Sequence, residues 1–260
     1  MKRVNAIQWM KKLAWFGFYA AVIFTLYQAV QFKANMTVQK VVITISTEDG
    51  QRALIGEKDV LRYINKSLDK DLEMLKIENL EAKKIESLLN DSKFINKAEV
   101  FVNTKGVVFI HCEVRTPIVR IDRGEKKGFY LDAAGNIIPL SKRATVRVPI
   151  ANGFLGEFNK DFLTVENDRY RQVLELAKKV NEDSFLNALI EQIYVESNGE
   201  VILIPKLGRQ KILFGEFASV DERFEKLKAF YKTGMPNSGW NRFEYLNLKW
   251  NDQVVGETRR

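Results

Sequence analysis

The chain has 260 residues, 46% hydrophobic and 28% charged, which indicates a folded protein long enough for two domains. Its net charge of +8 is concentrated at the ends: basic residues among the first twelve carry +4 and the last two residues carry +2. Only +2 is left for the 246 residues between them. This distribution favours a mixed-charge surface over a nucleic-acid-binding face, and the single cysteine excludes an internal disulfide.

A run of twenty uncharged residues, 13–32, follows the basic start of the chain. A helix of this length is about 30 Å long, close to the thickness of a bilayer's hydrocarbon core, so the run predicts a transmembrane helix. More basic residues precede the run than follow it, so we expect a cytoplasmic tail over 1–12 and the rest of the chain outside the cytoplasm. A cleaved signal peptide is the alternative, disfavoured by the length of the run and by the lack of a small-residue cleavage site.

The next segment, 36–116, has the pattern of a small α+β domain. Its hydrophobic periodicity predicts, in order, a strand over 37–45, helices over 57–68 and 80–90, and strands over 98–103 and 107–114. Cys112 shares a strand face with Val108 and Ile110, so we expect it to be buried and unreactive. His111 is the only histidine, which leaves no histidine-based metal cluster.

Pro117 begins the second predicted domain, 117–260, which is rich in strands with inserted helices. We expect hairpins over 129–138 and 193–205, strands over 147–150 and 211–214, and helices over 169–180, 184–190 and 219–234. The Asn198-Gly199 pair favours a type I′ turn. Ser219 begins a capping-box sequence, and Gly234 and Pro236 are expected to end the last helix.

The C-terminal segment predicts one long strand and one short one. Residues 243–250 alternate, which places Leu246, Leu248 and Trp250 on one face. Asn251-Asp252 predicts a turn into a last strand over 253–255. A terminal strand tends to form the edge of a sheet, where its free N–H and C=O groups can pair with a strand of another protein.

No pattern of an enzyme is present: the sequence has no phosphate-binding glycine loop, no nucleophile elbow and no metal-spaced histidines. We therefore expect no catalytic residue, no cofactor and no bound metal. Two other functions stay open. One is a membrane-anchored cell-envelope enzyme with a carboxylate pair that sequence does not reveal, and the other is an export or outer-membrane assembly factor with a POTRA domain.

Several blocks of the chain resemble the FtsQ/DivIB cell-division family, in their order and spacing over about 220 residues. They are FINKAEVFVN, VRTPIVRID, GFYLDAAGNIIPLS, EQIYVESNGEVILIP and FEYLNLKWNDQVV. The resemblance implies an α+β protein with a single N-terminal transmembrane helix, a POTRA-like β-α-α-β-β domain and a β-rich domain with inserted helices. It also implies a location at the division septum, in the inner membrane, with the C-terminal domains in the periplasm.

The function implied by this resemblance is that of a scaffold without catalytic activity. Such proteins bind FtsB and FtsL through the C-terminal β domain and thereby act on the septal peptidoglycan synthase complex. The family's arginine–tyrosine pair in the last long strand falls on Lys249 and Trp250, whereas a tryptophan of the family falls near Thr258 and is not matched. Simple core packing of Trp250 is an alternative that stays open. The predicted partner-binding residues are Tyr245, Leu246, Asn247, Leu248, Lys249, Trp250, Val254 and Val255.

Overall fold

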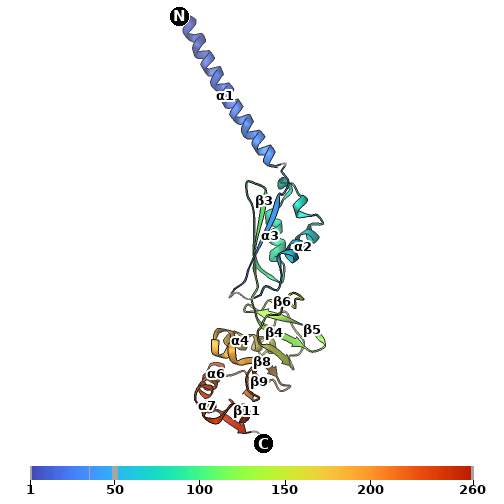
Figure 1. The fold of residues 1–260 in the computed structure, drawn as a ribbon, viewed down its shortest axis with the longest axis vertical. Helices are drawn as coiled ribbons and strands as arrows, with labels where there is room; N and C mark the ends of the chain where they lie inside the picture. Colours follow the sequence, from blue (N-terminus) through green and yellow to red (C-terminus); the bar gives the residue numbers. More distant parts are fainter. Residues whose placement is uncertain (1, 35, 49–51, 259–260) are drawn as a thin grey trace. The chain divides into compact units, whose positions relative to one another are not determined.

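A computed structural model of the chain describes residues 2–34, 36–48 and 52–258. The chain divides into two compact units (Figure 1), one formed by 1–46 and 56–113 and the other by 47–55 and 114–260. The predicted mixed α+β class is confirmed. The predicted domains are 36–116 and 117–260, and the second unit also takes in residues 47–55, which separate the two stretches of the first unit.

The predicted transmembrane helix is wrong. Residues 13–32 lie within one continuous helix, α1 (Lys2–Ala34). Among the described residues, however, no helix is both long and apolar enough to cross a membrane. The run lacks charge but includes polar side chains such as Thr25 and Gln28. The orientation inferred from the flanking basic residues, with 1–12 in the cytoplasm, loses its basis.

The remainder of the first unit is a small sheet with helices on one face. Its sheet has the strand order β1-β3-β2 among the described residues, with β1 parallel to β3. Figure 1 shows α2 and α3 along this sheet. In chain order the elements are β1 (Lys40–Ser46), α2 (Glu57–Leu68), η2 (Leu72–Met74), η3 (Ile77–Asn79), α3 (Ala82–Asn90), β2 (Ile95–Val102) and β3 (Val107–Val114).

Local signals in this unit act as the sequence predicts. Helix α2 has the predicted bounds. The two residues that gave it a helical pattern, Val60 and Ile64, are four positions apart and are buried against the sheet. The carboxylate of Asp59 accepts from the N–H of Gly56 and so caps the start of α2, at 3.0 Å. Cys112 is fully buried, as expected, and this burial raises its pKa to about 11.

The second unit is built on a large sheet that contains nine strands among the described residues, in the order β12-β11-β10-β9-β8-β7-β4-β5-β6. The strands are β4 (Pro117–Arg123), β5 (Lys126–Asp132), β6 (Ile137–Pro139), β7 (Ile150–Gly153), β8 (Ile190–Val195), β9 (Val201–Pro205), β10 (Lys211–Gly215), β11 (Phe243–Asn247) and β12 (Val255–Thr258). The helical segments are α4 (Arg169–Glu182), α5 (Ser184–Leu189), α6 (Val220–Ala229), η4 (Phe230–Gly234) and α7 (Met235–Ser238).

The hydrophobic core of this unit lies between the helices and one face of the large sheet. Helix α4 contributes Val173 and Ala177, and α6 contributes Phe224 and Leu227. They pack against alternate strand residues, which are buried because successive side chains of a strand point to opposite faces. The strand residues of this core include Val119, Ile121, Ile193, Leu203, Ile212, Phe214 and Leu246.

Three local predictions for the second unit are wrong in detail. In the 193–205 hairpin, Gly199 has a positive φ but Asn198 does not, so the turn is not type I′. The N–H of Gly199 instead donates to Glu196 and that of Glu196 to Glu200, which is the pattern of a type I turn followed by a left-handed glycine. Ser219 does not cap α6 with its side chain, because its backbone is left-handed, at φ 48°.

The third correction concerns the end of that helix. Gly234 and Pro236 do not terminate it: the chain continues through the π-turn η4 into α7 and leaves the helical conformation at Gly239, whose φ is +89°. Pro236 lies in the first turn of α7, directly after the π-turn η4.

Candidate partner-binding edge

The free edge at the carboxyl end of the large sheet is β12. Strand β11 is not an edge, because it pairs with β10 on one side and with β12 on the other. Strand β12 pairs only with β11 among the described residues, and it stands at the end of the strand order. The open backbone groups therefore belong to Val255–Thr258, one strand later than the long predicted strand over 243–250.

The predicted partner-binding residues separate into buried and exposed ones. Leu246 and Leu248 have no exposed surface and belong to the core. Trp250 is 57% exposed, so its interpretation as a core residue is wrong. Val255 on the edge strand is 37% exposed. The remaining predicted residues are half-buried or exposed: Tyr245, Asn247, Lys249 and Val254.

Trp250 leaves the face of Leu246 and Leu248 because β11 ends at Asn247. Alternation holds only along a strand, and Trp250 lies in the turn that joins β11 to β12. Asp252 in the same turn has a left-handed backbone, with φ 57°. The large indole ring is therefore presented to solvent beside the edge strand.

Lys226 holds this turn in place from helix α6. Its ammonium group donates to the carbonyl oxygen of Trp250 at 2.7 Å and to that of Leu248 at 3.4 Å. The side chain of Lys226 is only 14% exposed, and Glu222 pairs with it at 3.2 Å. A sheltered charge-assisted contact of this kind is stronger than one in open water, so Lys226 fixes the backbone from which the indole projects.

The neighbouring lysine anchors the same segment to the β8–β9 hairpin. The ammonium of Lys249 lies 2.9 Å from both carboxylate oxygens of Glu200. The hydrogen bond from Lys249 lowers the pKa of the Glu200 carboxyl. Gly215 permits this approach, since a Cβ at that position would lie 2.8 Å from the Cγ of Lys249. The end of β11 is thus held by one ion pair, Lys249–Glu200, and by the hydrogen bonds of Lys226 to two backbone carbonyls.

The Glu200–Lys249 pair makes a prediction about pH. Because the pKa of Glu200 is lower in the folded than in the unfolded chain, the pair stabilises the fold above the usual carboxyl pKa of about 4.3. This stabilising contribution is lost as the pH falls through the lower pKa that Glu200 has in the folded chain. In thermal unfolding, we expect Glu200→Gln to destabilise the protein at pH 7 by up to about 1 kcal/mol and to have a smaller effect near pH 3.

Glu244→Gln is the matched control for this experiment, because Glu244 is exposed and has no ion pair among the described residues. It should leave the melting temperature unchanged at both pH values. An effect of Glu200→Gln that is equal at pH 7 and pH 3 would show that the ion pair contributes nothing.

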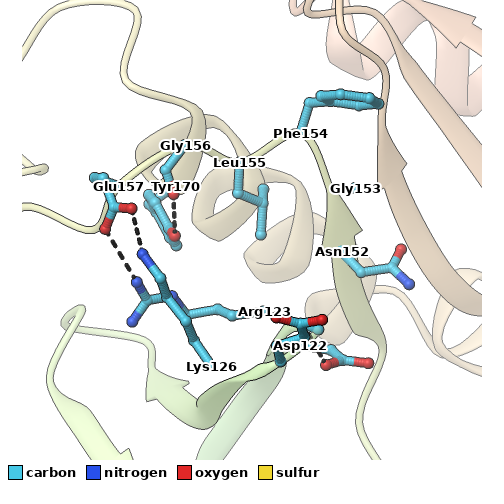
Figure 2. Close-up of a pocket in the computed structure, with 12 residues that line it drawn as sticks. Asp122, Arg123, Lys126, Asn152, Gly153, Phe154, Leu155, Gly156, Glu157 and Tyr170 are labelled. Carbon is cyan, nitrogen blue, oxygen red and sulfur yellow. Dashed lines mark hydrogen bonds and ion pairs between the residues drawn. The ribbon is translucent and has the colours of Figure 1, made fainter.

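A separate hollow, with a volume of about 680 Å³, lies where the β4–β5 hairpin faces the loop after β7. Figure 2 shows Arg123 and Lys126 both directed at Glu157, with the guanidinium of Arg123 3.4 Å from that carboxylate. The hydrogen bond from Lys126 lowers the pKa of Glu157. Tyr170 donates to the carbonyl of Gly156 at 3.0 Å. Arg123 and Lys126 thus pair with Glu157 and hold the loop onto the hairpin.

Sequence reasoning did not find Lys226 and Glu200. Both come from elements far from the C-terminal segment along the chain, Lys226 from a helix and Glu200 from a hairpin. Each has the pattern of an ordinary charged surface residue. Only the proximity of the elements in the folded unit shows that both support the turn that carries Trp250.

The comparison with protein families gives the assignment. Residues 116–257, more than half of the chain, match the family model described as FtsQ/DivIB, C-terminal related. The chain belongs to the FtsQ/DivIB family. The match covers the large sheet and its helices, including β11 and β12.

Membership in the FtsQ/DivIB family makes the chain a cell-division family protein. The resemblance inferred from the sequence blocks is thereby confirmed for the C-terminal part of the chain. No curated protein matches the chain. Members of the FtsQ/DivIB family are generally division proteins without enzymatic activity, and they act with other proteins of the division apparatus.

Proposed function

We propose that the chain is a non-enzymatic scaffold of the cell-division apparatus that binds FtsB- and FtsL-like proteins at the carboxyl end of its large sheet. Through these partners it influences the septal peptidoglycan synthase complex at the division septum. Family membership supports the cell-division role. The observation that carries the binding proposal is the open edge β12 with the exposed Trp250 beside it.

Two physical properties of this edge suit an extended partner segment. The outer backbone groups of β12 can form a further ladder of hydrogen bonds, which provides affinity without regard to sequence. An exposed tryptophan next to such a ladder provides selectivity, because burying a rigid aromatic ring is a common source of binding energy at interfaces. Lys226 holds the backbone that carries this ring before the partner arrives, which reduces the ordering required on binding.

The first unit supports a second docking role, as a POTRA-like domain. Two outer backbone amides of β2 are already occupied: Ala98 donates to Asn90 at 2.8 Å and Val100 donates to Glu86 at 2.8 Å. The other edge strand of this sheet, β1, pairs only with β3 among the described residues. In this proposal, other division proteins therefore add to β1 and not to β2.

A truncation tests the binding proposal. A chain that ends at Asn251 lacks β12 and keeps Trp250 and the contacts of Lys226. We expect it to retain the circular dichroism spectrum of the full chain and to lose co-purification with FtsB- and FtsL-like proteins. The full chain with Thr258→Ala is the control, because it alters a side chain of β12 and keeps its backbone. If the truncated chain captures these partners as well as the full chain does, the edge-strand proposal is wrong.

A further inference from the structure

A cluster of basic side chains in the second unit has no acidic partner. Arg52 and Arg147 line one cavity of about 470 Å³ together with Thr145 and Val146. The loop over 141–147, which carries Arg147, has two more basic residues, Lys142 and Arg143, and no acidic one. Among the described residues these four cations form no ion pair. Most of the other charged clusters described above contain both signs of charge.

The cavity is a built feature of the fold. Ser141 donates to the carbonyl of Leu54 at 2.6 Å and so ties the segment of Arg52 to the loop over 141–147. The N–H of Val146 donates to the hydroxyl of Tyr130, a buried residue of β5, at 3.4 Å. These contacts fix both walls of the cavity on the rigid sheet, so the two arginines are held near each other in spite of their like charge.

A further arginine, Arg120, lies next to the loop over 141–147. Arg120 on β4 is the register partner of Tyr130, so both side chains are on one face of the sheet. The Nε of Arg120 is buried and has no hydrogen-bond partner among the described residues. A buried donor without an acceptor is unfavourable, because it has lost its water without gaining a replacement. Arg120 adjoins the end of the loop, because its backbone N–H donates to the carbonyl of Pro149 at 2.9 Å.

Two backbone N–H groups of the loop are also unpaired within the described part of the chain. Residues 144–148 are outside the strands and helices, and the N–H groups of Thr145 and Arg147 have no acceptor among the described residues. Free backbone groups next to guanidinium groups suit a ligand that has both a peptide main chain and carboxylates. A lipid headgroup or free phosphate would use the arginines alone and would leave the main-chain groups unpaired.

We propose that this cavity, lined by Arg52 and Arg147, binds an acidic peptide segment of a partner protein. Carboxylates of the peptide pair with the guanidinium groups, and its main chain pairs with residues 144–148. The site is distinct from the β12 edge: Tyr130 lies on β5, next to the opposite end of the strand order. The proposal therefore does not depend on binding of FtsB- or FtsL-like proteins.

The test is a binding titration of the full chain with fluorescein-labelled hexaglutamate, followed by fluorescence anisotropy. We expect Arg52→Gln and Arg147→Gln each to weaken binding by about tenfold or more, the effect of losing one charge-assisted hydrogen bond. Arg171→Gln removes the same charge from an exposed position of α4 that has no ion pair among the described residues. It should change the affinity by about twofold at most, through net charge alone. Arg52 and Arg147 are both exposed, so their variants should have the same melting temperature as the wild type.

Two outcomes would overturn the proposal. One is an equal loss of hexaglutamate affinity in all three variants, which would mean that net charge and not the cavity determines binding. The other is that vesicles of phosphatidylglycerol bind in an Arg147-dependent manner while hexaglutamate does not, which would assign the cavity to a lipid surface. Trp250→Ala should leave hexaglutamate binding unchanged, which separates this site from the proposed function.

Discussion

Replacing Trp250 with alanine should weaken binding of an FtsB-like partner by about thirtyfold or more without lowering the stability of the fold. The indole is 57% exposed and lies outside the hydrophobic core, so its removal leaves no cavity. Truncating a tryptophan at the centre of an interface typically costs about 2 kcal/mol or more of binding free energy, which corresponds to this factor. The affinity is measured by calorimetry, and stability by thermal unfolding.

Phe154→Ala is the matched control for Trp250→Ala. Phe154 is a large aromatic residue with nearly the same exposure, 55%, and it lines the hollow near the β4–β5 hairpin instead of the β12 edge. We expect this variant to bind the partner like the wild type. Equal losses in both variants would mean that exposed aromatic surface in general, and not the position beside β12, determines binding.

Replacing Leu246 with alanine should have the opposite effect, a large loss of stability. Leu246 has no exposed surface and lies on β11 within the core of the second unit. Removing a fully buried leucine typically costs about 2–5 kcal/mol, because transfer free energy is lost and a cavity remains. For a unit of this size the melting temperature should fall by roughly 5–15 °C. Differential scanning calorimetry measures the change.

Tyr245→Ala in the same strand separates the loss of core packing from a general disturbance of β11. Tyr245 is half-buried and lies outside the core, so its replacement should cost roughly 1 kcal/mol or less. At a temperature where Leu246→Ala is still folded, that variant should bind the partner with nearly wild-type affinity, since its side chain faces the core. A large loss of affinity in folded Leu246→Ala would contradict this placement.

These two residues show how far sequence patterns reach in the C-terminal segment. Alternation correctly placed Leu246 and Leu248 on one face, but it extended that face to Trp250 because a pattern contains no information about where the strand ends. The end of β11 is determined by contacts from other elements, those of Lys226 on α6 and of Glu200 in the β8–β9 hairpin. Strand β12, and not β11, is the outer strand because it pairs with the side of β11 that β10 leaves open.

Sequence by itself determined the elements whose signals are local. Helix α2 has its predicted bounds, the hairpins over 129–138 and 193–205 are present, and Cys112 is buried as predicted. The family assignment also follows from the chain alone, since the order of the blocks is a property of the sequence. The uncharged run predicted a membrane span, but no helix among the described residues is long and apolar enough to form one.

Only the tertiary structure decided which strand edge is free, which of the C-terminal side chains face solvent, and which cations remain without partners. Each of these properties depends on groups that are distant in sequence. An edge is free only when no other strand reaches it, and a charge is unpaired only when no opposite charge lies within a few ångströms. Such proximity is produced by the packing of whole elements, which a local pattern of residues does not record.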